Sequence, residues 1–279
     1  MRLIRWLSSW TFAVCLALPS AVAFAQAPSD AANYQPQVGQ PGKDVIWVPT
    51  SQALIDKMLD VARVRPNDFI IDLGSGDGRM VITAAKRGAK ALGIEYNSDM
   101  VELSKHNAKN EGVSERAQFV KADIFESDFS IATVITMFLL PSINMKLRPK
   151  ILNLKPGTRI VSNSFDMEEW SADQIVIAEQ DCEHYCVAHF WIVPGKVAGR
   201  WQMTRGVMTL QQTFQIVSGT LRTESGVVEI TNGRLEGTRI DFSAGDTEYV
   251  GLVSGDRIDG VFRSPSGEGK WAAALIADP

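Results

Sequence analysis

The segment Ile70-Ile71-Asp72-Leu73-Gly74-Ser75-Gly76-Asp77-Gly78-Arg79 is the most informative part of this sequence. An apolar run ends in an acid, and three glycines at alternate positions lead into an amphipathic stretch that ends near Arg87. The apolar run predicts a buried strand, and the amphipathic stretch predicts a helix. Glycines between a strand and a helix permit a tight turn whose backbone can lie against a ligand. The segment therefore predicts the first strand–loop–helix unit of a ligand-binding α/β domain.

The acid at the end of this strand indicates what kind of ligand the loop holds. Gly74, Gly76 and Gly78 give the spacing G-x-G-x-G, whereas dinucleotide-binding loops have G-x-G-x-x-G and hold a pyrophosphate. The Asp72 carboxylate would repel a pyrophosphate but attract a ligand with an ammonium group. S-adenosylmethionine (SAM) carries an α-ammonium group and a sulfonium, so we expect SAM.

Two more acids follow the next two expected strands. Glu95 ends the second strand, where a carboxylate can accept hydrogen bonds from both ribose hydroxyls. Asp123 follows the third strand and can accept from the adenine amino group, while Ile124 packs on the ring. Ligands of open α/β sheets bind at the carboxyl ends of the strands. Three acids at three such ends predict one SAM-binding site.

The residues from about Val45 to Pro194 alternate between short apolar runs and amphipathic stretches, which predicts a mostly parallel sheet with helical crossovers. The last two strands are joined by a turn too short for a crossover, so they must form an antiparallel hairpin. The expected strands are 69–73, 91–94, 118–121, 132–138, 159–163, 174–179 and 187–193, and the expected helices are 79–87, 98–111, 144–152 and one that follows Ser51. The predicted fold is a Rossmann-like seven-stranded sheet with a terminal hairpin.

The pattern changes after Pro194-Gly195 to apolar alternation with glycine-containing turns and no helix signal. Such a pattern predicts a small antiparallel meander that curls into a barrel or a sandwich. The expected strands are 210–217, 220–223, 227–231, 234–242, 247–253, 257–262 and 270–276, with turns at Asn232-Gly233, Ser254-Gly255-Asp256 and Ser266-Gly267. Titratable residues form no catalytic pattern here, so we expect an interaction or capping module.

The first 25 residues have the features of a signal peptide. Arg2 and Arg5 precede an uncharged run, and Ala23-Phe24-Ala25 fits cleavage before Gln26. The alternative is an uncleaved membrane anchor. Either way, the positive-inside rule places the rest of the chain across the membrane, in the periplasm or anchored at the cell envelope. This location conflicts with the cytosolic supply of SAM.

These signals divide the chain into four parts: 1–25, the signal peptide or anchor; 26–44, a flexible linker rich in Ala, Pro, Gln and Gly; 45–195, the SAM-binding domain; and 196–279, the β domain. The net charge of −4 argues against nucleic acid as the main partner. Cys182 and Cys186 have a spacing that suits the two flanks of a hairpin turn, so either a disulfide or two free thiols is expected. A zinc site with His184 and His189 is much less favoured, and we expect no metal.

The SAM-binding part resembles the class I SAM-dependent methyltransferases. It is most similar to the mitochondrial protein-lysine methyltransferases of the ADP/ATP carrier and the ATP synthase c subunit, and to their bacterial relatives. The resemblance runs from about Val45 to Val193 and rests on these motifs: Val48-Pro49-Thr50, Asp72 to Arg79, Gly93-Ile94-Glu95, Phe138-Leu139-Leu140-Pro141, Lys146 to Lys150 and Leu154 to Thr158.

The resemblance implies a methyltransferase that uses SAM, with a protein lysine as the favoured acceptor. Asp72 and the glycine loop would hold the methionine part of SAM, with Glu95 at the ribose and Asp123 at the adenine. Thr50 would cover the cofactor from the side, and Phe138 would face the transferred methyl group.

The motif Phe-Leu-Leu-Pro stands where small-molecule amine methyltransferases often have Asn/Asp-Pro-Pro-aromatic. Phe138 would then be an apolar wall that favours a desolvated amine. In-line transfer from an activated sulfonium needs little acid–base chemistry, so we assign no general base. Lys146, Arg148 and Lys150 either steer an acidic partner or contact loops. A small-molecule or lipid acceptor, and a non-catalytic binding protein, remain the alternatives.

Overall fold

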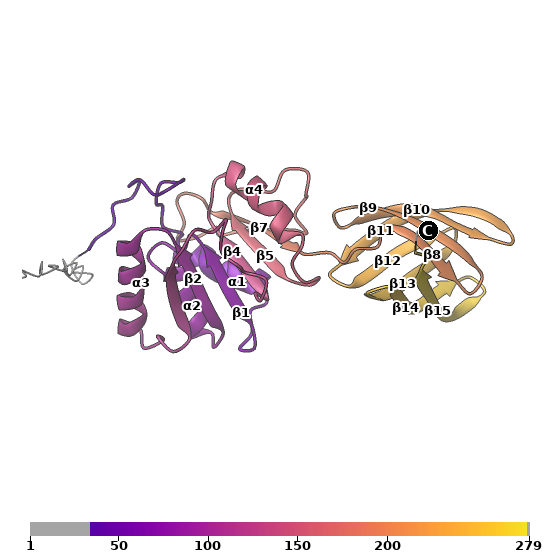
Figure 1. The fold of residues 1–279 in the computed structure, drawn as a ribbon, viewed down its shortest axis with the longest axis horizontal. Coiled ribbons are helices and arrows are strands. Elements are labelled where there is room, and N and C mark those ends of the chain that lie inside the picture. Colours follow the sequence, from indigo (N-terminus) through magenta and orange to yellow (C-terminus); the bar gives the residue numbers. More distant parts are fainter. Residues whose placement is uncertain (1–33, 278–279) are drawn as a thin grey trace, which may run out of the picture.

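A computed structural model describes residues 34–277 of the chain, and the predicted signal peptide or anchor lies outside this range. The described part has a seven-stranded mixed sheet followed by a closed eight-stranded antiparallel barrel, which confirms the predicted fold. Figure 1 shows the barrel beyond the side of the sheet that carries α4, with α3 at the opposite end. No helix between residues 34 and 277 has the length and apolar character needed to cross a membrane.

The sheet domain contains α1 (Gln52–Val61), β1 (Phe69–Leu73), α2 (Arg79–Lys86), β2 (Lys90–Glu95), α3 (Ser98–Asn110), β3 (Ala117–Lys121), β4 (Val134–Met137), α4 (Pro141–Ile151), β5 (Arg159–Asn163), β6 (Gln174–Ile177) and β7 (Val187–Ile192). The strand order is β3-β2-β1-β4-β5-β7-β6, and β7 runs antiparallel to both of its neighbours. β2 and β3 lie on one side of β1 in the sheet, and β4 and the later strands lie on the other side. The carboxyl ends of β1 and β4 therefore form the switch point at which open α/β sheets bind ligands.

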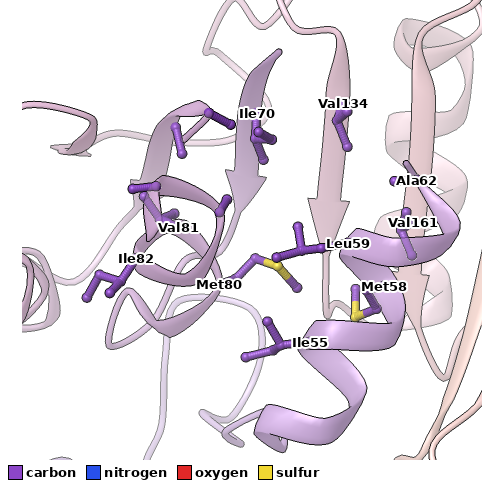
Figure 2. Packing of buried hydrophobic residues seen from close by; sticks show 14 of the residues in the cluster. Ile55, Met58, Leu59, Ala62, Ile70, Met80, Val81, Ile82, Val134 and Val161 are labelled. Carbon is purple, nitrogen blue, oxygen red and sulfur yellow. The ribbon is translucent and has the colours of Figure 1, made fainter. Parts of the chain in front are cut away.

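Helix α1 packs firmly against the sheet, because one of its faces is apolar. The side chain of Ser51 caps the helix by accepting a hydrogen bond from the amide of Leu54. Figure 2 shows Met58 and Leu59 of α1 lying between Met80 and the strands of the sheet. Met58 and Leu59 are at most 1% exposed, so truncation of either to Ala would cost about 2–5 kcal/mol. This packing holds the residues before α1 in a fixed position at the edge of the sheet.

The barrel consists of β8 (Gly199–Met203), β9 (Gly206–Thr213), β10 (Ile216–Thr223), β11 (Gly226–Glu236), β12 (Arg239–Ala244), β13 (Thr247–Ser254), β14 (Arg257–Ser264) and β15 (Gly267–Leu275). Two of the strand predictions were wrong in detail. The predicted strand 210–217 is divided by a turn at Phe214, and the predicted strand 234–242 is divided at Gly237. The predicted turn at Asn232-Gly233 is instead a bulge inside β11, where Asn232 has a left-handed φ of 54°. A bulge takes up the extra residue while both ladders continue.

The barrel docks on the sheet domain through the turn between β9 and β10. The Phe214 ring stacks on Trp170 with 6.0 Å between centroids, and the Arg148 guanidinium lies 5.3 Å from the centroid of the same ring. Gln215 donates a 2.7 Å hydrogen bond to the carbonyl of Ser171. These contacts place the turn against α4 and the loop that precedes β6.

The basic residues of α4 contact loops, which was one of the two alternatives for them. Arg148 donates to the carbonyl of Met167 and pairs with Glu169. Lys150 donates to the carbonyls of Phe125 and Ser127, and the Lys146 ammonium lies 5.8 Å from the Phe125 ring centroid.

Candidate cofactor and methyl-transfer site

An open cavity of about 1090 Å³, its mouth included, lies at the carboxyl ends of β1, β2 and β4. Its size is near the upper end of the range for ligand and cofactor sites. Eight of the nine residues predicted for the site line this cavity: Thr50, Asp72, Gly74, Gly76, Glu95, Asp123, Ile124 and Phe138. The ninth, Gly78, does not. The predicted residues come from separate segments of the chain, and the parallel sheet brings them together.

Asp72 is the buried charge of the site. It is 6% exposed, and its Oδ1 accepts a 2.6 Å hydrogen bond from the Thr136 hydroxyl. Burial raises the pKa of Asp72 to about 7, and the nearby carboxylates of Glu95 and Asp77 act in the same direction. A buried carboxylate without a cationic partner is unfavourable. A ligand ammonium group in the cavity would relieve this cost, which is the chemistry that the α-ammonium of SAM supplies.

The glycine loop has the conformation that its sequence predicts. Gly74, Gly76 and Gly78 all have positive φ, at 79°, 55° and 84°. A Cβ atom at Gly76 would stand 2.7 Å from Nε1 of Trp47, so the loop leaves no room for a side chain at that point. Gly78 instead packs away from the cavity, because a Cβ there would meet Phe119 at 2.8 Å. Its role is to start α2 close against the sheet rather than to touch a ligand.

Glu95 presents carboxylate oxygens to the cavity, whereas the Ser75 side chain packs on Gly93 of β2. The two Glu95 carboxylate oxygens accept hydrogen bonds from the amides of Gly76, at 3.0 Å, and Asn97, at 2.9 Å. Glu95 therefore ties the glycine loop to the end of β2 and still has free lone pairs for a ribose. The Ser75 hydroxyl is buried and has no hydrogen-bond partner among residues 34–277.

The end of the cavity predicted to hold adenine differs from the prediction, because the Asp123 carboxylate is paired with a lysine. Lys43 forms an ion pair with Asp123, and its ammonium lies 4.8 Å from the Tyr96 ring centroid. The hydrogen bond from Lys43 lowers the pKa of Asp123. Lys43 was not predicted as a site residue, since it lies in the segment assigned as a linker.

The described part of that segment is folded, so the prediction of a flexible linker over 26–44 fails for residues 37–44. The amide of Gly39 donates to the carbonyl of Trp47 at 2.8 Å, and the amide of Trp47 donates to the carbonyl of Gln40 at 2.9 Å. These bonds form a hairpin that lines the cavity. Its anchor is Trp47, which follows the predicted linker and packs on the glycine loop.

Thr50 joins this hairpin to the sheet. Its carbonyl accepts a 2.9 Å hydrogen bond from Arg79, and its hydroxyl accepts a 3.1 Å bond from the buried Asn163. Arg79 is held in place by Asp77, with Nη2 and Nε donating at 2.7 Å and 3.0 Å. Arg79 and Asn163 were not predicted as residues that hold Thr50 in place, because Thr50 is far from both of them in the sequence.

Phe138 stands where the cofactor cavity meets a second hollow of about 430 Å³. Its ring centroid lies 6.3 Å from that of Phe165 and 5.2 Å from that of Tyr185. Tyr185 lies between Cys182 and Cys186, which form a disulfide in the structure. In the described part of the chain, no three His, Cys, Asp or Glu side chains are grouped as metal ligands.

Known proteins resemble this chain in the region that builds the cavity. Residues 72–174 match the family model described as the ANTKMT methyltransferase domain. A protein-lysine N-methyltransferase of Saccharolobus islandicus is 44% identical over 138 residues, which is 48% of this chain and 86% of the relative. The human lysine N-methyltransferase of the ATP synthase c subunit is 32% identical over 130 residues, 46% of this chain and 55% of the relative. The chain thus spans about half the length of that human relative.

A solved structure is similar over the same region. The RNA methyltransferase of Salinibacter ruber, crystallised with S-adenosyl-L-homocysteine, is 44% identical, with a TM-score of 0.50. The match covers 54% of this chain and 96% of that one. Together with the buried carboxylate and the glycine loop, these similarities identify SAM as the cofactor. The chain belongs to the class I SAM-dependent methyltransferases, in the family defined by the ANTKMT methyltransferase domain.

Proposed function

We propose that this enzyme methylates a lysine side chain of a protein. The observation that carries the proposal is the shape of the site: a cavity with a buried, uncompensated carboxylate opens at Phe138 into a hollow without charged residues in its wall. The relatives named as protein-lysine methyltransferases support the same acceptor. A long aliphatic side chain with a terminal amine suits an apolar hollow of this kind.

Bound SAM supplies a methyl group that its sulfonium activates; the acceptor nitrogen forms a bond to the methyl carbon, and the electron pair of the broken C–S bond remains on sulfur. The chain itself contributes position and a dry environment. Asp72 and the glycine loop orient the methionine part, while Phe138 and Leu139 exclude water from the acceptor side. An apolar wall lowers the pKa of a lysine, so the ammonium group can lose one proton to solvent and react as the neutral amine; after transfer the methylated nitrogen carries the positive charge.

Methyl transfer from labelled SAM distinguishes the acceptor classes. The full chain and labelled SAM are incubated in parallel with a protein extract, a lipid extract and a metabolite extract of the source cells. The products of each reaction are analysed by mass spectrometry. We expect label on lysine of a protein. The variant Asp72→Asn should give no transfer, whereas Val227→Ala, an exposed position on the barrel, should match the wild type. Label in lipid or metabolite fractions alone would refute the protein-lysine assignment.

We also propose that the enzyme works on the far side of the membrane from the cytosol. The predicted signal peptide or anchor supports this location, and so does the disulfide between Cys182 and Cys186, because disulfides persist in oxidising compartments. A tag on the C-terminus, probed with protease in intact cells and in lysed cells, tests it. Protection in intact cells with permeable outer membranes would place the enzyme in the cytosol instead.

A further inference from the structure

We propose that Phe138, Phe165 and Tyr185 form a binding subsite for an alkylammonium group, and that the Cys182–Cys186 disulfide positions Tyr185 in it. This aromatic trio rests on the proposed function, since it names the surface on which the acceptor amine and its methylated products would lie. Phe165 and Tyr185 belong to different loops, after β5 and between β6 and β7, and neither lines the cofactor cavity.

The trio is a compact aromatic surface at the outer end of the second hollow. The ring centroids of Phe165 and Tyr185 are 6.3 Å apart, and each also lies 5.2–6.3 Å from the Phe138 centroid. An ammonium group resting on the open side of this surface lies within about 6 Å of the rings, the range in which their π-electrons attract a cation. Since Phe138 also borders the cofactor cavity, a group bound there is next to the methyl-transfer position.

The wall of the hollow carries no positive charge that would repel a cation: the lining side chains are Val45, Ile46, Val48, Phe138, Leu139, Leu140, Phe165 and Tyr185. A positively charged side chain in the hollow thus meets aromatic rings and no like charge.

The disulfide explains why Tyr185 is in the trio although little protein covers it. The Tyr185 side chain is 45% exposed, and both Asp181 and Tyr185 have left-handed backbones, with φ of 54° and 57°. Residues with a Cβ adopt such conformations only when the surroundings impose them. The disulfide closes the loop that contains Tyr185, directly after Asp181, and both of its cysteines pack on the buried cluster beneath α1. Tyr185 is therefore held against the phenylalanines by a covalent constraint.

The binding of a model cation to the full chain tests the subsite. The probes are a short peptide with one trimethyl-lysine and the same peptide with the neutral carbon isostere of that side chain. Dissociation constants are measured by NMR titration in the presence of S-adenosyl-L-homocysteine. We expect the cation to bind about three- to tenfold more tightly than the isostere. Tyr185→Phe should keep this preference and Tyr185→Ala should lose it.

A further variant and a second measurement separate the aromatic role from a structural one. The double variant Cys182→Ser/Cys186→Ser should reduce the preference as Tyr185→Ala does, because the ring is no longer held. Calorimetric affinity for S-adenosyl-L-homocysteine should stay at the wild-type value in all these variants, since none changes a residue that lines the cofactor cavity. A preference for the cation that survives in Tyr185→Ala, or equal binding of both probes to the wild type, would overturn the subsite.

The outcome separates this inference from the proposed function. Labelled lysine in proteins without any cation preference would leave the function standing and remove the aromatic subsite. A Tyr185-dependent cation preference, with label found only on amines of small molecules, would keep the subsite and remove the protein acceptor.

Discussion

Asp72→Asn tests whether the buried carboxylate is what the cofactor neutralises. The pKa of Asp72 is about 7 in the folded chain, against 3.8 for an unperturbed aspartate. The folded state holds the proton more tightly, so the stability linked to this group is fully present below pH 3.8 and is lost as the pH rises to about 7. One pKa unit corresponds to about 1.36 kcal/mol. Between pH 5 and pH 8 the wild type should therefore lose about 2–3 kcal/mol of unfolding free energy relative to the variant.

Chemical denaturation of the full chain at several pH values between 5 and 8 measures this difference. The neutral asparagine side chain of the variant can still accept the hydrogen bond from Thr136, but it does not titrate, so the other titrating groups cancel in the comparison. Parallel stability profiles for the wild type and the variant would refute the assignment of a raised pKa to Asp72.

The same carboxylate predicts how cofactor binding depends on pH. A group with a pKa of about 7 is about 3% ionised at pH 5.5 and half ionised at pH 7, so wild-type affinity for SAM should rise roughly 15-fold over this interval. Calorimetric titration measures the affinity. Asp72→Asn should bind weakly at every pH and show no such rise. A variant that retains wild-type affinity would show that Asp72 does not meet the ammonium group.

Two other predictions concern the segments that enclose the cavity. Gly76→Ala should lower SAM affinity at least tenfold and destabilise the chain by about 1–3 kcal/mol, because a Cβ there combines a left-handed backbone with contact to Trp47. Gly112 also has a left-handed backbone, but a Cβ there would meet open space. Gly112→Ala should therefore lower the unfolding free energy in denaturation and leave the calorimetric affinity for SAM unchanged. Lys43→Ala should bind SAM about threefold more tightly, because the carboxylate of Asp123 becomes free for the adenine amino group. Unchanged or weaker binding would mean that Lys43 does not compete with the cofactor.

Much of the cofactor site could be predicted from the sequence, because its signals are local. Asp72, Glu95 and Asp123 each end or follow an apolar strand, and parallel strands bring such ends to one edge of the sheet. The glycine spacing likewise reports a backbone requirement that needs no knowledge of distant residues. The roles of these residues toward SAM stay predictions, whereas their convergence on one cavity is a property of the fold.

The rest of the site depends on contacts between segments far apart in the chain. Lys43 lies in the polar stretch predicted as a linker and Trp47 follows it, and only their packing on the β2 and β3 ends and the glycine loop makes them part of the cavity. Tyr185 has no pattern that marks it as a partner of Phe138, because a helix and two strands separate the two residues along the chain.

The barrel shows the same division between local signals and tertiary pairing. The alternation of apolar residues and the glycine turns predicted strands of a meander that curls into a barrel or a sandwich, and the structure has the closed barrel. The pair Asn232-Gly233 favours left-handed backbone, which both a hairpin turn and a bulge require, so the local sequence is compatible with either. Because β11 pairs with both β10 and β12 before and after these residues, Asn232-Gly233 forms a bulge rather than a turn. The sequence by itself thus determined the elements and the acids at their ends, whereas the tertiary structure decided which distant side chains close the site, because such contacts exist only after the sheet has assembled.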